Sequence, residues 1–184
     1  LVLPGLAMDF IGTSRPASGS EHYLSHCWEV LFLRDGRPPE FHGRKVGVAT
    51  VLMADIYRRL AQMETPTFVR REMDTGRIQR FFTTIYPEIK KDVLARNVID
   101  DVGIDKLEAM WPQIREIIAT IPAPRVLADA LVAAGGASRP EGVHVEYSLA
   151  KESLIMCRYV RNRLTLYRLM DFIEHDDVFC HAAL

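Results

Sequence analysis

Apolar residues along this chain recur mostly at helical spacing. Between residues 17 and 33 an i, i+3, i+4, i+7 stripe predicts one amphipathic helix, and the stripe consists of Leu24, Cys27, Trp28 and Leu31. Sustained alternation of apolar and polar residues, which predicts strands, is absent from the sequence, and residues 143–147 form a single short β-prone run. The pattern therefore predicts an all-α fold, a multi-helix bundle.

The same spacing predicts helices along the rest of the chain. Residues 44–62 are apolar almost all round in their first half, which is typical of a buried central helix. Pro112 lies in the middle of the periodic segment 101–121 and should divide it into two abutting helices. The other predicted helices span residues 1–11, 75–83, 123–134 and 148–159, and the last of these is followed by a further helix that Thr165 caps.

Length and composition narrow the class of protein. With 184 residues the chain suits one domain, so we expect a single helical domain over residues 1–184. A formal net charge of -1 gives no attraction to nucleic acid or anionic lipid, and no apolar run approaches a membrane span. The three widely spaced cysteines suit free thiols, so we expect a cytoplasmic protein. Because a helical pattern begins at Leu1, we expect the natural chain to continue upstream.

Two histidines, His22 and His26, lie four residues apart on the helix predicted over residues 17–33. On a helical wheel they lie beside Ser18 and Glu29, opposite the apolar stripe, so both imidazoles should face away from the core. Such a pair can bind one Zn²⁺, because the side chains converge over one helical turn. Exposed or hydrogen-bonded surface histidines have the same spacing, and spacing alone favours that interpretation.

His42 precedes Gly43 at the start of the predicted central helix. A glycine there lets a ligand or another backbone approach closely, and a helix N-terminus favours anions. A structural role for His42 is the commoner alternative on the sequence pattern alone.

A basic run near the end of the chain consists of Arg158, Arg161, Arg163 and Arg168. Guanidinium groups suit phosphate recognition through paired hydrogen bonds. An isolated charge cluster is more often a solvated helix face, which is the interpretation that we favour here.

Longer motifs connect these residues to a known family. S-R-P-A-S-G-S-E-H-x-x-x-H at 14–26 and F-H-G-x-K-V-G-V-A-T at 41–50 strongly resemble the glycerol-1-phosphate dehydrogenase family, within the iron-containing alcohol dehydrogenase and dehydroquinate synthase-like superfamily. R-N-R-L-T-L-Y-R-L at 161–169 resembles that family's late Arg-x-Arg-(Tyr/Phe)-Thr segment. The resemblance implies two domains, an N-terminal nucleotide-binding domain and a helical metal-binding domain, and this chain resembles the second without the first.

The resemblance also implies a reaction. Family members reduce dihydroxyacetone phosphate to sn-glycerol 1-phosphate with NADH or NADPH, and a divalent metal, zinc or nickel, acts as a Lewis acid. The partner is thus a small phosphorylated molecule, and members often form homo-oligomers. The missing domain would bind the nucleotide, so no cofactor-binding residue is assigned here, and the isolated chain is expected to be inactive.

Position by position, the resemblance implies residue roles. His22 and His42 resemble the family's metal ligands, whereas His26 matches a residue of the substrate and nicotinamide pocket and could assist proton transfer. An aspartate ligand is expected upstream of this chain. The residues that could hold substrate oxygens near the metal are Ser14, Arg15, Ser18 and Ser20.

Other functions stay open at this point. A dehydroquinate synthase-type lyase or cyclase, or another polyol dehydrogenase, is compatible with the H-G-x-K-V-G-V-A-T segment, whereas S-R-P-A-S-G-S-E-H favours the glycerol phosphate enzymes. A non-catalytic helical module, whose histidine face contacts a protein partner, predicts no metal dependence.

Overall fold

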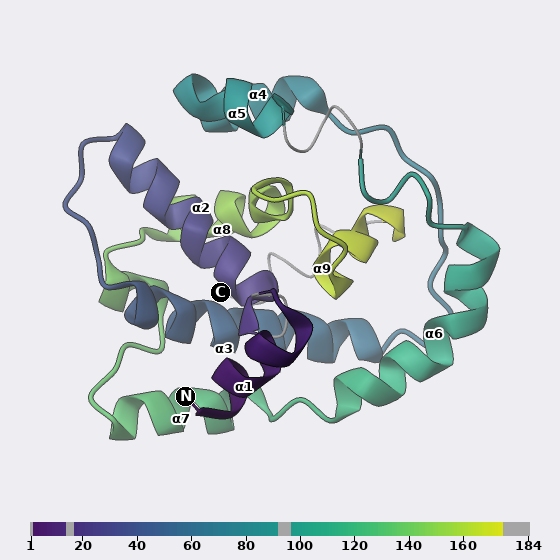
Figure 1. Ribbon diagram of the computed structural model, residues 1–184, viewed down its shortest axis with the longest axis horizontal. Coiled ribbons are helices and arrows are strands. Elements are labelled where there is room, and N and C mark those ends of the chain that lie inside the picture. The colour runs from purple at the N-terminus through teal and green to yellow at the C-terminus, as the bar shows by residue number, and fades with distance from the viewer. Residues whose placement is uncertain (1, 14–16, 92–96, 175–184) are drawn as a thin grey trace.

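The computed structural model of the protein describes residues 2–13, 17–91 and 97–174, and these ranges fold into helices without a strand (Figure 1). An isolated antiparallel bridge joins Phe68 to Ile173. The predicted all-α fold is confirmed, with the α-helices α1 (Val2–Ile11), α2 (Ser20–Arg34), α3 (His42–Ala61), α4 (Thr75–Phe82), α5 (Tyr86–Ile89), α6 (Ile104–Ala119), α7 (Pro124–Ala133), α8 (Tyr147–Met156) and α9 (Leu166–Leu169). Short 3₁₀ helices are η2 (Thr83–Ile85), η4 (Pro140–Val143), η5 (Cys157–Tyr159) and η6 (Met170–Phe172). Among the described residues, none of the helices is long and apolar enough to cross a membrane.

The core is built on the packing of α2 against α3. The predicted apolar stripe of α2 is confirmed, since all of its members are 0% exposed: Leu24, Cys27, Trp28 and Leu31. α3 buries an equally apolar face, which includes Val48, Ala49, Ile56 and Leu60. Each fully buried large apolar side chain stabilises the fold by about 1.5–3 kcal/mol, so this pair of helices supplies much of the driving force for folding.

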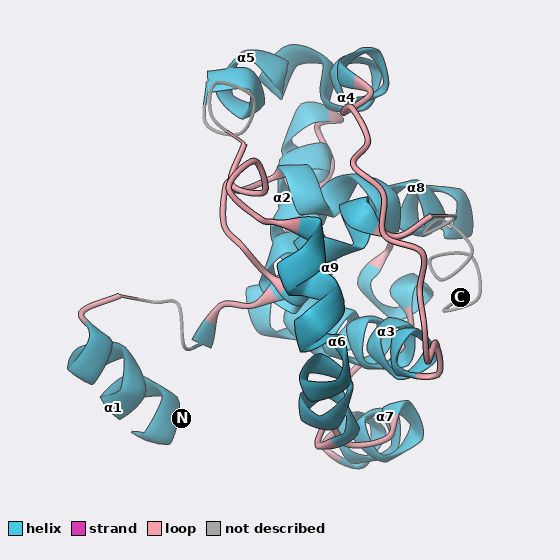
Figure 2. Ribbon diagram, turned by 90° about the vertical axis from the view of Figure 1, so that its right-hand side faces the viewer, coloured by secondary structure: helices cyan, strands magenta, loops and turns pink. Residues whose placement is uncertain are grey.

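α3 is the central helix that its apolar pattern predicts. Besides α2, the helices α6 and α7 pack against it, as the lower half of Figure 1 shows. The 3₁₀ helix η4 also packs against α3. α8 and η5 cover α2 on another side. In Figure 2, α1 stands apart from this assembly.

The connection between α2 and α3 places the start of α3 beside α2. Gly36 adopts a left-handed φ of 63°, and the Arg37 N–H donates to the Phe32 carbonyl over 2.8 Å. Glycine suits this position after a helix because it has no Cβ to clash in the left-handed region. Residues 35–41 therefore form the connection, and α3 begins with His42.

Pro112 does not divide the helix predicted over residues 101–121, so that prediction is wrong. α6 runs through Pro112 without interruption. The side chains of Trp111 and Ile118, on either side of the proline, are each 3% exposed and anchor both halves of α6 in the core. Tertiary packing thus offsets the hydrogen bond that proline removes from one helical turn.

The β-prone run at residues 143–147 forms no strand. η4 ends at Val143, His144 takes a left-handed φ of 60°, and α8 starts at Tyr147. The valines of the run, Val143 and Val145, are both 0% exposed. Their apolar character therefore reflects burial of a turn rather than pairing of strands.

The basic run is not a solvated helix face, contrary to the interpretation that its sequence favours. Arg158 and Arg168 are buried, and their guanidinium groups bind the two carboxylate oxygens of Asp171. Arg168 also donates to the side-chain oxygen of Asn97 over 2.7 Å. We call Arg158, Arg168 and Asp171 the buried arginine cluster. Arg161, in contrast, is exposed.

Replacing the bridging carboxylate should destabilise the fold strongly. Asp171→Ala leaves two buried guanidinium groups without their shared carboxylate, so we expect a loss of about 3–5 kcal/mol in the free energy of unfolding. Urea denaturation followed by circular dichroism measures this loss. The matched control is Asp129→Asn, which breaks the exposed pair with Arg125 and should change stability by less than about 0.5 kcal/mol. Equal stability of the two variants would contradict the assignment of a structural role to Asp171.

Candidate metal centre

Three histidines from two helices meet at one place on the surface of the α2–α3 pair. The ring centroids of His22 and His26 lie 6.4 Å apart, and His42 lies 5.4 Å from the first ring and 5.3 Å from the second. The side chains of His22 and His26 project from α2 on the face opposite its buried stripe, as the wheel predicts, and are 23% and 33% exposed. We call these three residues the histidine cluster.

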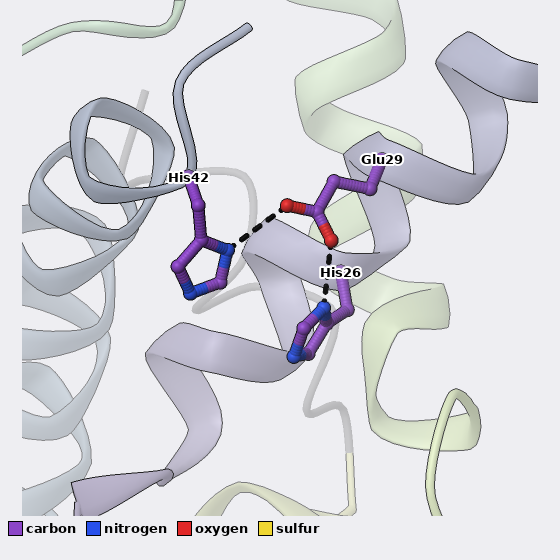
Figure 3. A group of neighbouring side chains, drawn as sticks. All are labelled: His26, Glu29 and His42. Carbon is purple, nitrogen blue, oxygen red and sulfur yellow. Dashed lines mark hydrogen bonds and ion pairs between the residues drawn. The ribbon is translucent and has the colours of Figure 1, made fainter. Parts of the chain in front are cut away.

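Glu29 links two members of the histidine cluster, as Figure 3 shows. Its Oε2 lies 2.8 Å from Nδ1 of His26, and its Oε1 lies 2.9 Å from Nδ1 of His42. A carboxylate oxygen accepts hydrogen bonds, so each ring donates from Nδ1, and in the neutral ring Nε2 then keeps its lone pair. The helical wheel places Glu29 on the histidine face, but no role is predicted for it from the sequence. Its spacing, one turn after His26, is the signal that could have found it.

Lys45 supports Glu29 from the side of α3. The ammonium group of Lys45 lies 3.0 Å from Oε1 of Glu29, and the lysine side chain is only 2% exposed. Burial of Glu29 opposes its charged form, but hydrogen bonds from the two histidines and Lys45, with the charge of Lys45, outweigh it and lower the pKa of Glu29 to about 2. The carboxylate is therefore charged at neutral pH. Lys45 lies within the second motif, but no role is predicted for it from the sequence.

His22 is oriented in the same way by its own neighbour. Nδ1 of His22 lies 2.7 Å from Oε1 of Glu21, and that oxygen also accepts the N–H of Gly19 over 2.9 Å. All three rings thus present Nδ1 to a carboxylate and retain Nε2 as a donor atom for a metal. Metal-bound histidines commonly have this arrangement, and imidazole nitrogen suits zinc and nickel. The residues present therefore fit a divalent transition metal.

A second way of holding a cation is also geometrically open. One ligand atom from each of His26, Glu29 and His42 lies within 4.8 Å of the others, so these three side chains could surround an ion directly. In that arrangement Glu29 would be a ligand rather than a hydrogen-bond acceptor for the rings.

The residues predicted to bind substrate are only partly described. Ser14 and Arg15 lie outside the described residues. Ser18 is half-buried, just before α2. Ser20 is the first residue of α2, and its hydroxyl accepts a hydrogen bond from the Tyr57 hydroxyl over 2.6 Å. A role in substrate binding stays a prediction for all four residues.

Comparison with known proteins places the chain among dehydrogenases. It is 33% identical over 175 residues to the glycerol-1-phosphate dehydrogenase [NAD(P)+] of Geobacillus stearothermophilus, covering 94% of this chain and 37% of the relative. The Bacillus subtilis (strain 168) protein of the same name is 30% identical over 171 residues, which cover 93% of this chain and 34% of that protein. The protein of that name from Halalkalibacterium halodurans is 50% identical over a shorter stretch of 68 residues, 37% of this chain and 17% of that protein.

The matches cover nearly all of this chain but only part of each relative. No family model matches the chain, and no solved structure matches it. The chain spans 34–37% of the length of the relatives that match nearly all of it. The similarity nevertheless extends along 90–98% of this chain in several such proteins. This similarity over nearly the whole chain shows that the chain belongs to the glycerol-1-phosphate dehydrogenase family.

Proposed function

We propose that this chain is the metal-binding and substrate-binding part of an NAD(P)-dependent sn-glycerol-1-phosphate dehydrogenase that reduces dihydroxyacetone phosphate. The observation that carries the proposal is the histidine cluster, in which three rings within 6.4 Å of one another all keep Nε2 available. Relatives that match nearly the whole chain are named as dehydrogenases of this kind.

His22 and His42 are the proposed metal ligands. A divalent cation held there, zinc or nickel, supplies Lewis-acid stabilisation of the negative charge that develops on the carbonyl oxygen during reduction. His26, beside both rings, lines the substrate pocket and exchanges a proton with the substrate oxygen. Ser18 and Ser20, with Ser14 and Arg15, bind oxygens of the phosphorylated substrate.

Nucleotide binding is proposed to come from another part of the enzyme. The described residues form no strand, whereas dinucleotides bind at the edge of a parallel sheet in α/β domains. The histidine cluster lies on the outer face of α2, where a neighbouring domain can close over it. An aspartate of that domain completes the ligand set, because a catalytic metal commonly has three protein ligands.

The isolated chain should not turn over substrate. We expect no oxidation of NADH or NADPH with dihydroxyacetone phosphate, whereas the Geobacillus stearothermophilus relative should show it under the same conditions. The absorbance of the reduced nicotinamide at 340 nm, a property of the cofactor, follows the reaction. Turnover by this chain alone would contradict the proposed division of labour.

Metal binding should depend on the histidine cluster. We expect His42→Ala to weaken the binding of Zn²⁺ or Ni²⁺ by about tenfold or more, because a ligand is lost. Isothermal titration calorimetry measures the affinity. The matched control is His144→Asn, since His144 is 76% exposed outside the cluster and asparagine tolerates its left-handed backbone. If both variants bind the metal as tightly as the wild type, the metal-dependent function fails.

A further inference from the structure

The carboxylate of Glu29 occupies a position between the two helices that carry the histidine cluster. We infer that Glu29, held in place by Lys45, is a positioning residue: it fixes the proton of both His26 and His42 on Nδ1 and so reserves both Nε2 atoms for the metal and substrate side. This inference rests on the proposed function for its purpose, and on the contacts of Glu29 for its geometry.

Both oxygens of Glu29 already have partners. Oε2 accepts from His26 over 2.8 Å, whereas Oε1 accepts from His42 over 2.9 Å and from Lys45 over 3.0 Å. Direct ligation of a cation by Glu29 would have to displace at least one of these contacts. It would also bring a divalent cation close to the ammonium group, and like charges in a partly buried site repel strongly.

Lys45 decides which of the two possible roles Glu29 has. The lysine side chain is 2% exposed, and a buried ammonium group requires a charged or hydrogen-bonding partner. Glu29 provides that partner, and Lys45 lies one turn after His42 on α3. The position of the carboxylate is therefore set from α3, while the residue itself belongs to α2. One side chain thereby aligns a ring on each helix.

The hydrogen bonds to Glu29 affect how tightly the histidine rings bind a metal. A histidine that donates its Nδ1 proton to a carboxylate has a fixed orientation and a more basic Nε2, and removal of such a carboxylate typically lowers metal affinity by about 10- to 100-fold. His22 has its own carboxylate, Glu21, and does not depend on Glu29.

The decisive experiment reads the protonated nitrogen directly, in the metal-free chain. Two-bond ¹H–¹⁵N correlation spectra at a pH of about 8, where an ordinary imidazole is neutral, distinguish Nδ1–H from Nε2–H rings. We expect the Nδ1–H form for His26 and His42 in the wild type and its loss for both rings in Glu29→Ala. His22 should keep its Nδ1–H form in the same spectrum and serves as an internal control.

A conservative variant sharpens the test. In Glu29→Gln the amide has one acceptor oxygen, and the ammonium group of Lys45 draws that oxygen to its own side, which is also the side of His42. We therefore expect His42 to keep the Nδ1–H form and His26 to change to Nε2–H. The reverse assignment would overturn the role of Lys45.

Metal binding gives the second measurement. Zn²⁺ affinity should fall by about 10- to 100-fold in Glu29→Ala and stay unchanged in Asp129→Asn, which removes an exposed carboxylate from α7.

Unchanged ring protonation in Glu29→Ala would overturn the inference even if the protein is a dehydrogenase. A Zn²⁺-bound crystal structure with a Glu29 oxygen at about 2.0–2.2 Å from the metal would overturn it as well, by making Glu29 a ligand. Because the spectra need neither nucleotide nor substrate, a lack of enzyme turnover bears on the proposed function and not on this test.

Discussion

The packing of α2 against α3 is the interaction on which the rest of the structure depends. α2 buries one apolar face completely, so its opposite face has to carry polar side chains, and the histidines occupy that face. The short loop between the helices then sets His42 beside them. The same contact that supplies the hydrophobic core therefore also brings the candidate ligands together, and any change that shifts α3 along α2 alters both.

Much of this arrangement could be predicted from the sequence, because it follows from local periodicity. The stripe around Trp28 defines the buried face of α2, and the wheel then places His22 and His26 outward. The loop ending at Pro39 and the apolar first half of α3 are equally local signals. Only the resemblance to the family's motifs predicted that His42 lies with His22 and His26, because no periodicity links residues on different helices.

The wrong or missing predictions have a different physical origin. Arg168 contacts Asn97, 71 positions away in the sequence, and Lys45 pairs with Glu29 on another helix. A charged residue that is buried with such a partner has the same local sequence pattern as one on a solvated surface. Pro112 shows the converse, because core packing on both sides of the proline outweighs a local helix-breaking preference. In each case tertiary contacts override what a short window of sequence indicates.

The histidine cluster, Glu29 and Lys45 all come from one helix–loop–helix unit over residues 20–61. Closing a single short loop is enough to assemble them, and the entropy cost of loop closure increases with loop length. Arg168, in contrast, reaches Asn97 and Met73 across 71 and 95 positions of sequence. Contacts between nearby segments form faster than contacts between distant ones. The candidate metal centre is therefore assembled from neighbouring segments, whereas the contacts of Arg168 with Asn97 and Met73 form only when distant segments of the chain meet.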